Sequence, residues 1–185
     1  MDIDKMINSA FAEVVPGEGY FMVEGNPTTN AIRILPADKA MNDNLVCFAW
    51  SVDLGFQYLG LFTDEKTAQR QVDIIRSKIR DEAGNKLLRT SLTLSEAGLE
   101  LLMYKKLWLV DVYPSENKVR LSVEADVVTS NIEAFAAGEH TGYQFVCLVV
   151  DEVAAKEIER RIRTRVRDEA GTRLAFDSTI RKDGE

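Results

Sequence analysis

The sequence repeats itself at a fixed offset of 87 residues, and this feature constrains the fold more than any other. Residues 20–91 align without a gap on residues 107–178, with 22 identical pairs out of 72, where chance would give about four. The longest matching run joins residues 75–84 to residues 162–171. A gapless match of this length indicates an internal duplication, so we expect two copies of one structural unit.

Each copy ends in a segment with the pattern of a long amphipathic helix. Apolar residues recur at spacings of three and four from Ala68 to Ala83, and again from Ala155 to Ala170. The equivalent residues Asp64 and Asp151 suit the N-cap, and the following glutamates suit the first turn. Gly84 and Gly171 suit a left-handed C-terminal cap. We therefore predict one long helix per copy between these signals.

Before each long helix, the sequence predicts four strands. Short runs rich in β-branched and aromatic residues cover 20–25, 30–36, 45–53 and 55–63, and in the second copy 107–112, 117–123, 131–137 and 143–150. A shorter amphipathic helix is expected to open each copy, over 3–14 and 97–104. The predicted class is α+β: one short helix, a four-stranded antiparallel sheet and one long helix, twice, packed as a pseudo-dimer. We place the repeats at 1–92 and 93–176, followed by a flexible tail at 177–185.

Alternation along the predicted strands suggests that one sheet face is covered by helices and the other carries aromatic and arginine side chains. Exposed aromatic rings stack on bases, and guanidinium groups bind phosphates or stack themselves, so such a face suits single-stranded nucleic acid. The candidate binding residues are Arg33, Phe48, Trp50, Phe56, Tyr58, Arg76, Lys118, Arg120, Phe135, Tyr143, Phe145 and Arg163.

Structural explanations compete for the same residues. The aromatic rings could fill a core between the two copies. Arg33 and Arg120 could form salt bridges, for example with Asp81/Glu82 and Asp168/Glu169, instead of contacting phosphates. Arg76 and Arg163 belong to a basic cluster that a solvated helix face would also explain. Whether the aromatic rings are exposed or buried distinguishes a nucleic-acid platform from a core.

The duplicated order of four strands and a long helix, with the paired positions Arg33/Arg120, Phe56/Tyr143 and Phe48/Phe135, resembles the whirly and Pur-alpha class of single-stranded nucleic-acid-binding proteins. It is also similar to the duplicated RNA-binding proteins of large phages that build a nucleus-like compartment. The resemblance implies RNA or single-stranded DNA lying across open sheet faces, with RNA favoured. It would place a phage protein in the host cytoplasm.

Composition limits the other functions. The only histidine is His140, and no nucleophile motif, glycine-rich phosphate loop or metal-ligand spacing occurs, so we expect neither an enzyme nor a cofactor. Cys47 and Cys147 are read as small buried thiols in a reducing compartment, and no apolar run could span a membrane, so a cytoplasmic protein is expected. Because the net charge is −7, an acidic module that binds a protein partner, or forms a homo-oligomer, is the alternative function.

Overall fold

The computed structural model describes residues 19–88 and 107–174, and both repeats follow the order strand, strand, helix, strand, helix. Repeat 1 contains β1 (Phe21–Asn26), β2 (Ala31–Pro36), α2 (Ala37–Trp50), β3 (Gln57–Phe62) and α3 (Glu65–Lys78). Repeat 2 contains β4 (Trp108–Tyr113), the short 3-10 helix η1 (Pro114–Glu116), β5 (Lys118–Val123), α4 (Glu124–Ala137), β6 (Gln144–Val149) and α5 (Glu152–Arg165). The mixed α+β class is confirmed.

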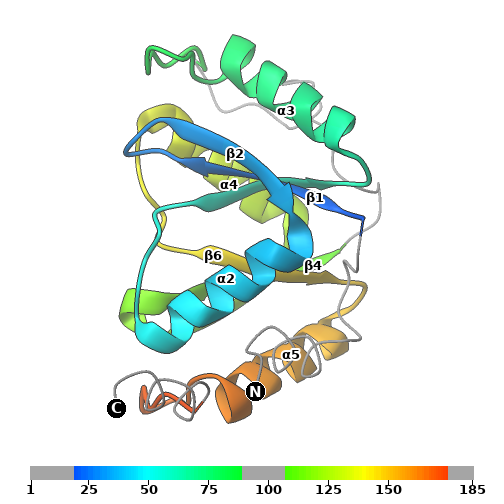
Figure 1. Ribbon diagram of the computed structural model, residues 1–185, viewed down its shortest axis with the longest axis vertical. Coiled ribbons are helices and arrows are strands. Elements are labelled where there is room, and N and C mark those ends of the chain that lie inside the picture. The colour runs from blue at the N-terminus through cyan, green and yellow to red at the C-terminus, as the bar shows by residue number, and fades with distance from the viewer. Residues whose placement is uncertain (1–18, 89–106, 175–185) are drawn as a thin grey trace, which may run out of the picture.

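Each repeat forms a three-stranded antiparallel sheet within the described residues, in the orders β2-β1-β3 and β5-β4-β6 (Figure 1). The central strand pairs with both neighbours, and the register places Glu24 opposite Arg33 and Asp111 opposite Arg120. Residues directly opposite in a ladder share a face. The register therefore sets an acid beside an arginine at the same place in each sheet.

The prediction of a strand at 45–53 and at 131–137 is wrong, because residues 45–50 belong to α2, residues 51–53 to the loop after it, and residues 131–137 to α4. A short window shows apolar alternation, but the pattern over the whole segment is helical. The buried residues of α2 are spaced three and one apart, which is the stripe of a helix; they are Ala37, Ala40, Met41, Asn44, Leu45, Phe48 and Ala49. The buried residues of α4 have the same spacing.

The long helices begin as predicted but end earlier. The side chains of Asp64 and Asp151 accept hydrogen bonds from the backbone N–H of Thr67 and Ala154, which confirms both N-caps. The helices end at residues 78 and 165, six residues before the glycines expected to cap them. Gly84 has the positive φ (+87°) that was expected, but it closes a separate turn in which its N–H donates to the Asp81 carbonyl.

The two repeats interlock through their shorter helices, with α4 beside the sheet of repeat 1 and α2 beside the sheet of repeat 2 (Figure 1). One core joins β1–β3 and α3 to buried residues of α4, and the other joins β4, β6 and α5 to buried residues of α2. Asn131 of α4 donates to the Tyr58 carbonyl of β3 (2.8 Å), and Asn44 of α2 donates to the Phe145 carbonyl of β6 (2.9 Å). Each repeat thus completes the core of the other.

The predicted opening helices (3–14 and 97–104) and the tail (177–185) lie outside the described residues.

Candidate functional site

Four of the aromatic candidates are buried between the repeats instead of lining an open face. Tyr58, Phe145, Phe48 and Phe135 expose at most 1% of their surface. A ring without accessible surface cannot stack on a base, so the structure removes these four residues from a nucleic-acid platform in this conformation. The strands that carry Tyr58 and Phe145 and the helices that carry Phe48 and Phe135 present these rings to the core.

Tyr58 and Phe145 stack on each other where the two repeats meet. Their ring centroids are 5.0 Å apart and their planes differ by 13°. The Tyr58 hydroxyl donates to the Glu124 carboxylate (2.5 Å), and burial raises the pKa of both groups. Because Tyr58 and Phe145 are equivalent positions, this stacked pair lies on the pseudo-twofold axis and satisfies its one polar group internally.

Phe48 and Phe135 are each covered by two arginines of the other repeat, one near the end of its long helix and one just after that helix. The guanidinium carbons of Arg76 and Arg80 lie 5.8 and 5.5 Å from the centroid of the Phe135 ring. Those of Arg163 and Arg167 lie 5.6 and 5.5 Å from the Phe48 ring. These cation–π contacts join the repeats symmetrically.

Arg76 and Arg163 also hold the first hairpin of their own repeat. Arg76 donates to the side-chain and backbone oxygens of Asn30 (2.9 and 2.6 Å), and Arg163 donates likewise to Asn117 (2.8 Å each). Both asparagines have positive φ, 60° and 53°, a conformation that asparagine tolerates better than most residues. The two arginines therefore have full structural roles.

Arg33 with Phe56, and Arg120 with Tyr143, are the candidates that the structure brings together at the surface. The guanidinium carbon lies 3.9 Å from the ring centroid in the first pair and 3.8 Å in the second. The arginine side chains are 32% and 30% exposed, and both rings are half-buried. We call these two pairs the arginine–aromatic sites.

A buried carboxylate lies under each arginine–aromatic site, and sequence reasoning missed both. Arg33 Nε donates to Glu24 (2.8 Å), and Arg120 donates through Nε (2.9 Å) and Nη2 to Asp111. Burial raises the pKa of Glu24 and raises that of Asp111 to about 6, against the lowering effect of the arginines. The signal in the sequence was an acid at equivalent positions of two otherwise apolar strands. Arg33 and Arg120 thus form salt bridges, one of the two alternatives, but with Glu24 and Asp111 and not with the Asp-Glu pairs at 81–82 and 168–169.

Lys118 and Trp50 lie at the surface with partners of their own. Lys118 forms an ion pair with Glu116. Trp50 ends α2, and the guanidinium carbon of Arg173 lies 3.7 Å from its ring centroid. Both remain accessible to a ligand.

The loops α2–β3 and α4–β6 meet across the pseudo-axis. Asp53 accepts from Gln144 (3.0 Å) and lies 2.7 Å from His140 Nε2. Gln57 donates to the Asn131 carbonyl (2.8 Å) and accepts from the backbone N–H of Thr141 (3.2 Å). His140 and Asp53 occupy equivalent positions of the two repeats. Their contact gives the chain's one histidine a structural partner.

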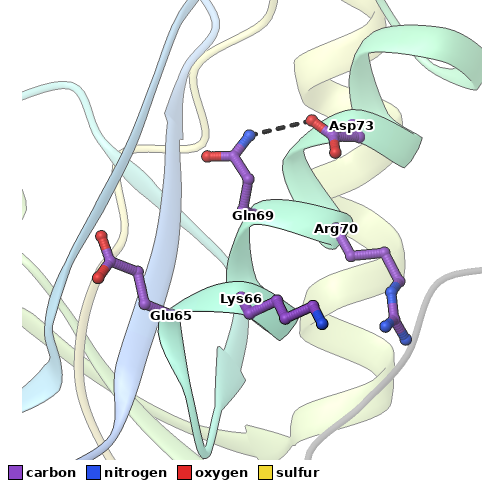
Figure 2. A pocket seen from close by; sticks show the side chains of 5 residues that line it. All are labelled: Glu65, Lys66, Gln69, Arg70 and Asp73. Carbon is purple, nitrogen blue, oxygen red and sulfur yellow. Dashed lines mark hydrogen bonds between the residues drawn. The ribbon is translucent and has the colours of Figure 1, made fainter.

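Two shallow depressions lie along α3 and the segment after it. Figure 2 shows an open depression lined by exposed residues of one helix; they are Glu65, Lys66, Gln69, Arg70 and Asp73. Gln69 donates to Asp73 across it (3.0 Å). A second depression continues toward Asp81 and Glu82. Neither includes an arginine–aromatic site, and neither encloses a substrate-sized space.

Within residues 19–88 and 107–174 no cluster of three potential metal ligands occurs. Both cysteines are free thiols, with Cys147 buried and Cys47 half-buried, and burial raises the pKa of Cys47 to about 11. A thiol with a raised pKa is a poor nucleophile at neutral pH. None of the helices in these two ranges has the length and apolarity to cross a bilayer.

No protein-family model matches the chain, and no curated protein or solved structure matches it significantly.

Proposed function

We propose that the protein binds single-stranded nucleic acid, RNA ahead of DNA, at the two arginine–aromatic sites. The observation that supports the proposal is that both repeats present a guanidinium stacked on a ring, with about a third of the arginine side chain accessible. A base can stack on a guanidinium plane or on an aromatic ring without regard to its sequence. Two such sites on one chain would engage separate nucleotides of the same strand.

The buried acids determine how these sites would bind. Glu24 and Asp111 already balance the charge of Arg33 and Arg120, so a phosphate gains little Coulomb energy there. Stacking would supply most of the affinity, at about 1–3 kcal/mol per base. Because few counterions are released, affinity should fall only gently as salt rises.

The remaining candidates divide by accessibility. Lys118 and Trp50 are exposed and remain available for further contacts. Arg76 and Arg163 would contribute indirectly, by holding the hairpins in which the sites are built. Binding would thus take place at the two arginine–aromatic sites, and the four buried rings would stay in the core.

The test is fluorescence anisotropy with labelled RNA and DNA of about 20 nucleotides, at about 50 and 200 mM salt. One variant combines Phe56→Leu with Tyr143→Leu, which keeps apolar volume and removes the rings. Another combines Arg33→Lys with Arg120→Lys, which keeps the charge and removes the guanidinium plane. The matched control, Lys78→Ala with Arg165→Ala, removes two exposed cations from equivalent places on the long helices.

Both site variants should lose at least about tenfold in affinity, because each removes a stacking surface. The control should change affinity less than about threefold, and the wild-type salt slope should be shallow. Unchanged binding in both site variants, or no binding of either nucleic acid at the lower salt, would refute the proposal. Far-ultraviolet circular dichroism of each variant verifies that the fold is retained.

A further inference from the structure

The two arginine–aromatic sites differ in the residues that flank them. In repeat 2, Lys118 and Tyr113 lie beside the guanidinium and the ring. The equivalent residues of repeat 1 are Ala31 and Asn26, which offer neither a cation nor a second ring. Since the same fold forms in repeat 1 without them, Lys118 and Tyr113 are not needed to build the sheet.

The strand register brings these flanking residues together with the arginine–aromatic pair of repeat 2. Lys118 and Arg120 are two residues apart on β5, so their side chains lie on one face, about 7 Å apart along the strand. Tyr113 is directly opposite Lys118 in the ladder between β4 and β5. The Tyr113 ring meets the Tyr143 ring edge-on, with centroids 5.1 Å apart and planes at 61°. Contacts therefore run from Arg120 through Tyr143 to Tyr113, with Lys118 beside them.

The Tyr113 ring is held in place by the backbone of Gly142. Gly142 has a positive φ (+81°), and a Cβ at this position would come within 2.3 Å of Tyr113 Cζ. The ring is half-buried, so one side packs on the chain while the rest remains accessible. A ring that is already fixed loses little entropy when a ligand binds.

We propose that the arginine–aromatic site of repeat 2 binds a whole nucleotide, with its base stacked on the Arg120–Tyr143 pair and its phosphate on Lys118. The inference rests on the function proposed above and adds the group that contacts the phosphate. The Lys118 side chain is 58% exposed, and Glu116 raises its pKa, so the ammonium group stays charged at neutral pH. Repeat 1 has Ala31 at this position, so its site would contribute stacking without this phosphate contact.

Glu116 competes with a phosphate for Lys118. The two side chains are 58% and 46% exposed, and an ion pair exposed to this degree contributes little to stability. The charge of Arg120, by contrast, is balanced by the buried Asp111. A phosphate therefore gains more from Lys118 than from Arg120, because it gives up only a weak surface pair.

The experiment measures the anisotropy of labelled RNA of about 20 nucleotides, titrated with the full chain between about 50 and 200 mM salt. Lys118→Ala removes the proposed phosphate contact, and Glu116→Gln removes its competitor. The matched controls are Lys156→Ala and Glu152→Gln, because these two residues form a similarly exposed ion pair in the same repeat (2.7 Å; 65% and 49% exposed). Circular dichroism verifies the fold of each variant.

Lys118→Ala should weaken binding at least about fivefold at the lower salt, because it removes a charge-assisted contact. It should also make the slope of log affinity against log salt shallower than in Lys156→Ala by about 0.7, the value for one phosphate of a single strand. Glu116→Gln should tighten binding at least about twofold more than Glu152→Gln, which also removes one negative charge.

The inference is overturned if Lys118→Ala has the affinity or the salt slope of Lys156→Ala, or if the two glutamine variants bind alike. The stacking variant Phe56→Leu/Tyr143→Leu keeps the two proposals distinguishable. If that variant loses affinity while Lys118→Ala behaves like its control, the nucleic-acid function stands and the phosphate contact is refuted. If the wild type binds neither RNA nor DNA, both proposals are refuted.

Discussion

The contacts between the hairpins and the segments that follow the long helices are nearly identical in the two repeats, whereas the loops that follow α2 and α4 keep the same helix caps but differ in their side chains. Arg80 donates to the Pro27 carbonyl at 2.6 Å, and Arg167 donates to the Pro114 carbonyl at 2.7 Å. By contrast, the loop sequence Ser-Val-Asp-Leu at 51–54 stands opposite Gly-Glu-His-Thr at 138–141. Since both repeats come from one unit, the contacts retained twice are those that the fold requires.

The retained contacts satisfy backbone groups that would otherwise lack partners. A hairpin turn and a helix end leave carbonyl oxygens without partners in the strand or helix pattern. Arginine supplies several donors from one side chain, and here it serves the turn, the segment after the helix and a helix of the other repeat. The side chains at 51–54 and 138–141 take no part in these contacts, so they were free to diverge.

The largest effect is expected from Phe48 and Phe135, whose rings are buried where the two repeats pack together. Phe48→Ala and Phe135→Ala should each lower the free energy of unfolding by about 3–5 kcal/mol, because each removes a fully buried ring. The two costs should agree within about 1 kcal/mol if the repeats are energetically equivalent. Urea unfolding followed by circular dichroism measures both. Costs that differ by more would show that one repeat dominates the stability.

The sequence was sufficient to predict the features that depend on local patterns. The duplication and both helix starts at Asp64 and Asp151 follow from spacing and capping chemistry, and the structure confirms both caps. The helices α2 and α4 were missed because strand-like alternation at 45–53 hid a helical stripe that begins at Ala37. A sequence window extended to Ala37 would have distinguished the helical period of about 3.6 residues from the strand period of about two.

The burial of the aromatic candidates could not be predicted, because it depends on how the repeats pack. Tyr58 and Phe56 are two residues apart on the same segment, yet one ring is buried and the other is half-exposed. Their difference comes from Phe145 and Glu124, which another part of the chain brings to Tyr58. Strand alternation identifies a face but does not say what covers it.

The second prediction compares the two arginine–aromatic sites. Arg120→Ala leaves Asp111 buried without its partner and should destabilise the fold by about 3 kcal/mol, near the lower limit for such pairs because Arg120 is partly exposed. Arg33→Ala should cost less, since Asn44 Nδ2 also lies 3.4 Å from Glu24. Combining Arg120→Ala with Asp111→Asn should restore part of the loss. Equal costs at both sites, measured by urea unfolding, would contradict the role given to Asn44.

The third prediction concerns the pH dependence that Asp111 imposes on repeat 2. Burial raises its pKa from 3.8 to about 6, so between these values the folded protein binds a proton that the unfolded chain does not. The wild type should therefore lose stability as pH rises from about 4 to about 6, while Asp111→Asn does not share this loss. Relative to the wild type, the variant should gain about 2 kcal/mol between pH 4.5 and 7.5. A constant difference in unfolding free energy across this range would contradict the raised pKa.

The smallest effect is expected where the loops meet, at the contact between Asp53 and His140. Asp53 and His140 are both partly exposed and lie 2.7 Å apart, so their coupling should be only about 0.2–1 kcal/mol. A double-mutant cycle with Asp53→Asn and His140→Gln measures this coupling by urea unfolding. The pair is an ion pair only while His140 is protonated. A coupling above about 2 kcal/mol would show that the contact between the loops helps to hold the two repeats together.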